Sequence, residues 1–188
     1  MPDDVPPVAL PAGVTLRLLH RDDGPALAAA YRRDREHLEP WEPARPAAFY
    51  EAAYHAARIP VQLLEHLNGR STPFVLTRGA DVVGRVTLSD VVRGSFCNAH
   101  LGYWLASDLT GRGVMTAAVE AVAVFARDDL GLHRLQAATL LHNTASQRVL
   151  DRTGFARIGT APQYLRIAGR WQDHALFQRI LPDDEAPA

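Results

Sequence analysis

The chain has 188 residues, of which 47% are hydrophobic and 22% charged, and its formal net charge at pH 7 is -1. This length and composition are typical of one globular domain, and the balanced charge predicts no direct binding of nucleic acid. Cys97 is the only cysteine, so an intrachain disulfide is excluded, and no His/Cys spacing suggests a metal site.

Both ends of the chain are rich in proline and acidic residues, which predicts tails at residues 1–13 and 182–188 around a single domain at 14–181. The first residues lack the basic and apolar segments of a secretory signal, and no apolar run reaches about 18 residues. We therefore expect a cytoplasmic protein without a membrane partner.

The first half of the chain predicts a strand at 14–19 and then a helix, with Asp22 or Asp23 as its N-cap and a proline in its first turn. Residues 35–43 are predicted to form a bend, because each of their two prolines disfavours the α region for the preceding residue. A second helix is expected at 46–67, where an Asn-Gly pair follows.

An antiparallel meander of three strands is predicted next, at 74–77, 82–88 and 99–105. Apolar residues then recur at helical spacing from Thr116 until Gly131, which is expected to end the helix.

The last part of the chain predicts a strand at 133–140 and, at 144–147, a capping box that opens a helix ending at Gly154. Two final strands are expected at 155–158 and 174–180. The predicted order is β-α-α-β-β-β-α-β-α-β-β, mostly antiparallel, with one parallel pair where a helix crosses between strands. This pattern is typical of an α/β (α+β) fold.

The most informative segment is Gly111-Arg112-Gly113, between a strand and a helix. The first amides of a helix lack intrahelical acceptors, glycine admits a close anion, and the helix dipole favours negative charge, so a pyrophosphate fits here. Val114 and Met115 replace the Lys-Ser/Thr of a Walker motif, and the third glycine of a Rossmann fingerprint is missing. A plain strand-to-helix connection is the alternative reading of the glycines.

With Thr110 and Met115 at its ends, this loop resembles the signature of the GNAT superfamily of N-acetyltransferases, in the variant of its RimJ/RimL branch. The resemblance covers about residues 15–180, and both end positions depart from the general Gln/Arg-x-x-Gly-x-Gly/Ala pattern. Other segments that resemble the branch, in the same order, are 35–41, 91–96, 101–103, 133–134, 143–146, 154–155 and 164–174.

The resemblance implies a mixed, mostly antiparallel sheet of about seven strands, with helices on both faces and a parallel strand pair splayed at the coenzyme A (CoA) site. It implies acetyl-CoA as co-substrate and no metal. The CoA-binding residues that it implies are Tyr103, Trp104, Leu105, Arg112, Gly113, Val114, Met115, Thr116, Asn143 and Ser146. Ser146 is also the candidate for a role at the leaving thiolate, although Asn and Ser at this place are also ordinary helix caps.

An α-amine has a pKa near ~8 and a lysine amine near ~10.4, so an α-amine is the easier acceptor for a site without an obvious strong base. Glu36 and His100 are the candidate bases, each with a structural role as its alternative. Some relatives carry a carboxylate near the position of Leu165, which cannot titrate, so the base remains open. The candidate acceptor-binding residues are Glu36, Trp41, Tyr164 and Asp173, with Trp171 as a further aromatic wall.

Three functions are compatible with these residues. The first, implied by the resemblance, is acetylation of a protein N-terminus, with a small-subunit ribosomal protein as the implied acceptor. The second is acetylation of a small amine such as an antibiotic, polyamine or aminoacyl nucleotide, for which Glu36, Glu39 and Glu42 could line a cleft. The third is a non-catalytic acyl-CoA-binding role in ribosome assembly. A monomer and a homodimer are both compatible with the sequence.

Overall fold

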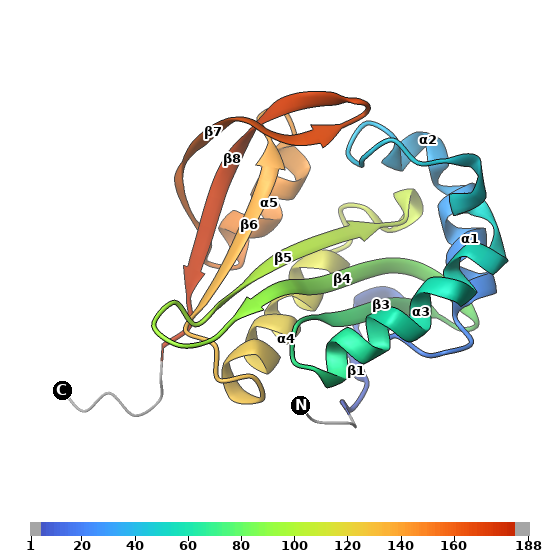
Figure 1. Cartoon of the computed structure of the whole chain (residues 1–188), viewed down its shortest axis with the longest axis horizontal. Coiled ribbons are helices and arrows are strands. Elements are labelled where there is room, and N and C mark those ends of the chain that lie inside the picture. Colours follow the sequence, from blue (N-terminus) through green and yellow to red (C-terminus); the bar gives the residue numbers. More distant parts are fainter. Residues whose placement is uncertain (1–4, 183–188) are drawn as a thin grey trace.

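The computed structural model describes residues 5–182, which contain one eight-stranded sheet with strand order β1-β2-β3-β4-β5-β6-β8-β7 (Figure 1). The strands are β1 (Val8–Leu10), β2 (Val14–Leu18), β3 (Thr72–Arg78), β4 (Asp81–Val92), β5 (Asn98–Leu105), β6 (Arg134–Leu140), β7 (Ala156–Ile167) and β8 (Arg170–Ile180). The helices are α1 (Gly24–Arg33), α2 (Arg35–Leu38), α3 (Ala52–Leu67), α4 (Val114–Asp128) and α5 (Thr144–Arg152), with 3-10 turns η1 (Pro11–Gly13), η2 (Ala47–Tyr50) and η3 (Ser107–Leu109).

The predicted mixed, mostly antiparallel fold is confirmed, with eight strands instead of about seven. All neighbouring strands are antiparallel except β5 and β6, which form the predicted parallel pair. The additional strand is β1, which falls in the segment that we predicted to be a tail. It pairs with β2 and buries Leu10 in the core, so residues 8–13 do not extend as a tail. Residues 1–4 and 183–188 of the two predicted tails lie outside the described residues.

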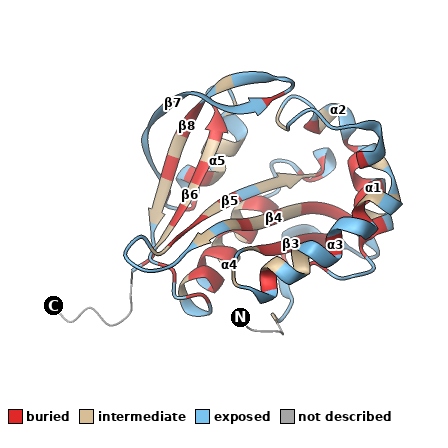
Figure 2. Cartoon of the chain, viewed as in Figure 1, coloured by how far each residue is buried: buried red, intermediate tan, exposed pale blue. Residues whose placement is uncertain are grey.

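The sheet has a hydrophobic core on each face. Phe74 and Leu76 of β3 belong to the core that contains α4, whereas Val75 between them belongs to the core that contains α1 and α3. This alternation follows from the two-residue repeat of a strand. Figure 2 shows the buried residues where these helices meet the sheet, while much of β7 is exposed.

Two predicted local features differ from the structure between α1 and α3. The bend at 35–43 contains the single helical turn α2, because both prolines lie beyond it. The helix predicted at 46–67 is divided at Glu51, whose extended backbone separates η2 from α3 and lets Phe49 enter the second core. Asp23 does occupy the N-cap position of α1, but its carboxylate binds the Arg17 guanidinium at 2.7 and 2.8 Å instead of a helix amide.

The β5–β6 pair separates along its length. The two strands are paired only from Asn98 to His100, against Arg134 to Gln136, and beyond these residues they diverge (Figure 1). The continuing part of β5 remains bonded to β4, and the continuing part of β6 remains bonded to β8. The backbone edges that face each other across this splay therefore lack a strand partner.

Candidate active site

The glycine loop follows β5 and η3 and leads into α4, which begins at Val114, two residues earlier than predicted. Gly111 and Gly113 have φ of +75° and +76°, a left-handed conformation that strains any residue with a Cβ. A Cβ at either position would meet no atom within 4 Å, so the space above the loop is open. The loop therefore needs glycine for its backbone conformation and leaves room for a ligand.

The amides at the start of α4 are the donors that this loop presents. The first bond of the helix ladder runs from the amide of Ala117 to the carbonyl of Gly113 at 3.0 Å. The amides of Val114, Met115 and Thr116 precede it and belong to the first turn, which has no intrahelical acceptors. The side chain of Arg112 is exposed beside them. Unpaired amides, a helix dipole and a nearby guanidinium fit a diphosphate group.

On one face of β5, Tyr103 joins the β5–β6 splay, the candidate cleft for CoA, to the start of α5. Its hydroxyl lies 2.8 Å from the Ser146 hydroxyl and 3.2 Å from the Ser146 carbonyl. Burial raises the pKa of Tyr103 to about 12, so the phenol stays protonated at neutral pH. The Asn143 side chain accepts the amide of Ser146 at 3.1 Å.

This contact corrects the predicted capping box at 144–147. Asn143 is the N-cap of α5, one residue before the box, and Gln147 donates to the carbonyls of Leu140 and Leu141 instead of reaching back to a cap. The carbonyls at the end of β6 are available to Gln147 because the chain leaves the sheet there. The structure thus brings Asn143, Ser146 and Tyr103 together on one wall of the splay.

On the other face of β5, Trp104 joins the cleft to α1. Its indole nitrogen donates to the Tyr31 hydroxyl at 2.8 Å, and the two rings lie 4.8 Å apart. Tyr31 is 5% exposed and also packs edge-on against Phe49 and in a stack with His55. Burial raises the pKa of Tyr31 to about 12. Trp104 is therefore held against the core that contains α1 and α3.

A cavity of about 190 Å³ lies next to Tyr31, and its lining includes Glu39 and Glu42 but not Glu36, of the three glutamates that the sequence offered for a cleft. It is lined by Tyr31, Arg35, Leu38, Glu39, Glu42, Pro43, Ala44, Arg45, Tyr50 and Ala168. The side chain of Glu42 is only 16% exposed and pairs with Arg45 at 3.2 Å. Burial raises the pKa of Glu42, although the Arg45 guanidinium opposes the rise. The sequence signal for this site was the group of glutamates in the predicted bend.

Comparisons with known proteins agree with this geometry. Residues 14–156 match the model of the acetyltransferase (GNAT) domain. The [ribosomal protein uS5]-alanine N-acetyltransferase of Escherichia coli is 34% identical over 183 residues, which cover 96% of this chain and 94% of that protein.

The chain belongs to the GNAT acetyltransferase family.

Solved structures of this family place the chain near the RimJ branch. A ribosomal-protein-S5-alanine acetyltransferase from Vibrio fischeri is 33% identical with a TM-score of 0.91, covering 98% of this chain and 100% of that one. Mycobacterium smegmatis RimJ in complex with CoA-disulfide is 34% identical with a TM-score of 0.88, covering 100% of this chain and 90% of that one. The predicted resemblance is thereby confirmed.

As a GNAT enzyme the chain is an acetyl-CoA-dependent N-acetyltransferase, and the glycine loop and the β5–β6 splay fit that co-substrate. Within residues 5–182, no group of His, Cys, Asp or Glu side chains is arranged to hold a metal ion. Over the same residues, no helix is both long and apolar enough to cross a membrane.

The two candidate bases of this acetyltransferase lie in different environments. His100 is partly buried on β5 at the last pair before the strands separate, opposite Gln136 of β6 and Ser89 of β4. Glu36 lies exposed on α2, does not line the cavity, and makes no hydrogen bond or ion pair within residues 5–182. The structure therefore brings His100 to the vertex of the splay and leaves Glu36 on the surface.

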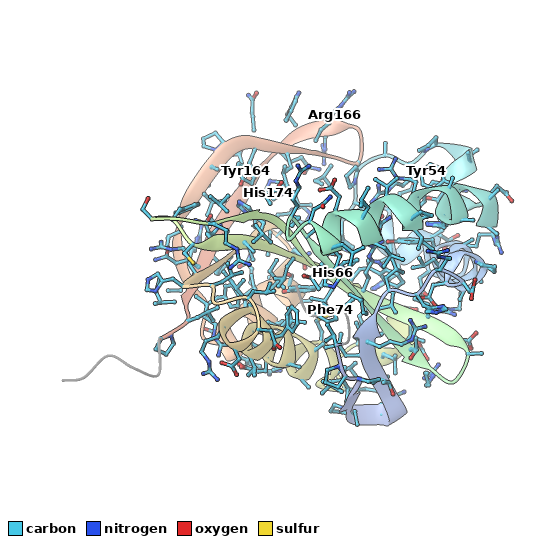
Figure 3. All side chains as sticks on the ribbon, turned by 60° about the horizontal axis from the view of Figure 1, so that its bottom comes forward. Tyr54, His66, Phe74, Tyr164, Arg166 and His174 are labelled. Atoms are coloured by element: carbon cyan, nitrogen blue, oxygen red, sulfur yellow. The ribbon has the colours of Figure 1, made fainter. Side chains whose placement is uncertain are left out.

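The predicted acceptor-binding residues of the GNAT chain are divided between two regions. Trp41 lies with its ring 5.4 Å from His142, in the loop that precedes Asn143. Apart from Glu36 on α2, the others are on the β7–β8 hairpin, where Figure 3 shows Tyr164 beside His174, and Arg166 farther along the hairpin.

Two hairpin residues have positions that the sequence did not indicate. Asp173 accepts the amide of Gln163, whose φ is +47°, at 2.9 Å and so holds an irregular turn of β7. Trp171 is 62% exposed, opposite Arg166 near the end of the hairpin. Leu165 is also exposed there, opposite Gln172.

Proposed function

We propose that this acetyltransferase transfers the acetyl group of acetyl-CoA to the N-terminal α-amine of a ribosomal protein in the cytoplasm, and that the acceptor belongs to the small subunit. The observation that carries the proposal is the match along nearly the whole chain to enzymes named for acetylating the alanine of ribosomal protein uS5. The structural match covers 98% of this chain and 100% of the Vibrio fischeri enzyme, so the proposal is supported by similarity along nearly the whole chain.

In this proposal the CoA diphosphate is bound by the amides from Gly113 to Thr116 and by the Arg112 side chain, because the amide predicted at Arg112 donates to the Leu109 carbonyl at 3.4 Å. The pantetheine arm lies in the splay and bonds to the backbone of Tyr103, Trp104 and Leu105, in place of the strand partner that β5 lacks there. Asn143 contacts the arm from the start of α5.

The chemistry needs a neutral amine, close approach to the thioester carbonyl, and a proton for the thiolate that leaves. We assign the last task to Ser146, whose hydroxyl lies 2.8 Å from the Tyr103 hydroxyl. A protonated phenol behind the serine can replace the proton that the serine gives up. No covalent enzyme intermediate is required.

The proposed acceptor is tested by measuring thiol release from acetyl-CoA with short peptides that differ in their first residue. Antibiotics and polyamines are assayed in parallel. We expect turnover with peptides that begin with alanine or serine. Turnover with small amines alone would replace this function by small-molecule acetylation, and CoA binding without any turnover would favour a role in ribosome assembly.

We predict that Ser146→Ala lowers kcat by at least about tenfold, because general acid catalysis contributes roughly 10²–10⁴ to a rate. The same change should lower the free energy of unfolding by only about 1 kcal/mol, the worth of one hydrogen bond, since Asn143 provides the cap of α5. Kinetics and thermal unfolding of one preparation measure both quantities.

Thr144→Ala is the matched control for this prediction, because Thr144 is exposed on the same helical turn. We expect its kcat to equal that of the unsubstituted enzyme. If Ser146→Ala also kept full kcat, the assignment of the thiolate proton to Ser146 would be wrong, and its hydroxyl would serve only to hold Tyr103.

A further inference from the structure

Glu42 is a carboxylate held in place at the wall of the cavity. Its own backbone carbonyl accepts the amide of Ala168 at 2.9 Å, which ties this segment to the tip of the β7–β8 hairpin. The preceding residue, Trp41, packs against His142. Glu42 is therefore fixed between two elements that border the acetyl-CoA cleft.

The hydrogen bonding of this carboxylate is incomplete. Oε2 accepts the Arg45 guanidinium at 3.2 Å, and among residues 5–182 nothing donates to Oε1. Arg45 does not serve Glu42 alone, because its guanidinium also lies over the Phe49 ring, 4.4 Å from the ring centre. A carboxylate with little exposure and one bonded oxygen is costly unless a second donor is supplied. An ammonium group is such a donor.

Glu42 keeps one oxygen without a bonded donor among the charged groups of residues 5–182 that surround it. The charged and titratable groups that face it from the packed elements are Tyr31 of α1, Arg35 of α2, Glu39, Arg45, Tyr50 of η2 and Arg85 of β4. The lining arginines balance the two lining carboxylates, and Arg35 lies over the Tyr50 ring at 4.7 Å. Both lining arginines are thus engaged by aromatic rings, whereas Glu42 keeps one oxygen for a ligand.

Two side-chain contacts connect the wall of the cavity with the residues beside the splay. Tyr31 lines the cavity with its ring and accepts the Trp104 indole with its hydroxyl. Trp104 belongs to the part of β5 that borders the splay. Trp41, the residue before Glu42, packs against His142, which is adjacent to Asn143. These contacts place the cavity next to the proposed CoA site.

We propose that Glu42 is the catalytic base, a carboxylate that binds the ammonium of the acceptor and removes one proton from it. The proton passes from the nitrogen to the carboxylate, and the freed electron pair forms the C–N bond with the thioester carbonyl carbon. When the C–S bond breaks, the thiolate receives the second proton lost by the nitrogen, through Ser146. Glu42 then releases its proton to solvent. This assignment rests on the proposed amine acetylation. It leaves the proposed CoA-binding residues unchanged.

The environment of Glu42 suits this task. An ordinary glutamate has a pKa near ~4.3, far below that of an α-amine near ~8, so the proton transfer is uphill. Burial raises the pKa of Glu42 and narrows this gap. The carboxylate must still be ionised to accept the proton, so the enzyme loses activity when the pH falls through the pKa of Glu42.

The test is the pH profile of kcat/KM for three proteins acting on one peptide. For the unsubstituted enzyme we expect a plateau between the pKa of Glu42 and about pH 8, because the reactive pair is ionised Glu42 and protonated amine. Glu42→Gln should lower kcat/KM at pH 7 by about 100-fold or more, and its remaining activity should rise with pH up to about 8 as free amine accumulates. Arg45→Gln should move the acid limb to higher pH, because Arg45 lowers the pKa of Glu42.

Glu65→Gln is the matched control, since Glu65 also pairs with an arginine, Arg70 at 3.6 Å, but lies on α3 outside the cavity. Its profile should equal that of the unsubstituted enzyme. Thermal unfolding of Glu42→Gln shows whether this variant folds, and its CoA affinity shows whether it binds the co-substrate.

Two results would overturn the assignment. One is an unchanged acid limb in Glu42→Gln, and the other is an acid limb that stays in place in Arg45→Gln. If the unsubstituted enzyme acetylated no amine at all, the proposed function would fail first, so the two failures are distinguishable. A Glu42→Gln protein that did not fold would leave the decision to the Arg45→Gln profile.

Discussion

Gly113→Trp should raise the dissociation constant of CoA by at least about 100-fold, the equivalent of losing two charge-assisted hydrogen bonds. Gly113 is the N-cap of α4, its φ is +76°, and a Cβ there would point into open space. An indole at this position fills the space above the amides of the first turn, where we place the diphosphate. Calorimetric titration with CoA measures the effect.

Gly131→Trp is the control for this substitution. Gly131 lies beyond the other end of α4, has a φ of +57°, and also has no atom within 4 Å of an added Cβ. Both variants should lose a similar amount of stability, roughly 1–2 kcal/mol, from a left-handed residue with a side chain. Equal CoA affinity in the two variants would show that the diphosphate does not bind at the start of α4.

Asp34→Ala should lower the free energy of unfolding by about 3 kcal/mol, a shift of roughly 6–12 °C in Tm for a chain of this size. The Asp34 side chain is 2% exposed and its Oδ1 accepts both the amide and the hydroxyl of Ser107 at 2.9 Å. Its Oδ2 binds Arg33 at 2.9 Å. The carboxylate thus anchors η3, directly before the glycine loop, to the end of α1.

The effect of Asp34 should depend on pH. Burial acts to raise the pKa of Asp34, but the hydrogen bonds from Ser107 and the Arg33 guanidinium outweigh it, and the pKa is lowered in the folded protein. A lowered pKa means that the stabilisation is complete above the unfolded value, near ~3.9, and is lost as the pH falls through the folded value. The stability difference between the unsubstituted protein and Asp34→Ala should therefore shrink below about pH 4.

Asp108→Ala provides the matched comparison in urea unfolding. Asp108 also pairs with an arginine, Arg78 at 2.9 Å, but its side chain is 51% exposed. A surface pair of this kind contributes about 0–1 kcal/mol. If both alanine variants lost the same small amount, the burial and bonding of Asp34 would not stabilise the fold as we infer.

The helices and strands were predictable where one local pattern decides them. The three central strands and α4 followed from alternation and helical spacing, and the parallel β5–β6 pair followed from the helix that crosses between them. The errors have tertiary causes. β1 forms because Leu10 gains a buried place beside β2, and the β7–β8 hairpin extends far beyond the predicted strands because each strand supplies the other's hydrogen bonds.

The N-caps of α1 and α5 also show what the local sequence can and cannot predict. Asp23 and Asn143 both occupy N-cap positions, yet only Asn143 caps with its side chain. The carboxylate of Asp23 instead binds the Arg17 guanidinium of β2 and the His20 amide, both of which precede the helix. An N-cap side chain that finds such partners does not bond to the helix amides, and the residue type alone does not tell which partners it will have.

The sequence by itself determined the glycine loop, because a turn with two left-handed residues followed by the first amides of a helix is a property of contiguous backbone. Only the tertiary structure decided which side chains meet at the cleft. Tyr103 reaches Ser146 across 43 positions of sequence, and Trp104 reaches Tyr31 across 73. The environment of Glu42 is also tertiary, since the cavity beside it is lined by Tyr31 of α1 and by Ala168 of the β7–β8 hairpin, which lie far apart along the chain. Proximity and dielectric surroundings arise from packing, so no pattern of neighbouring residues specifies them.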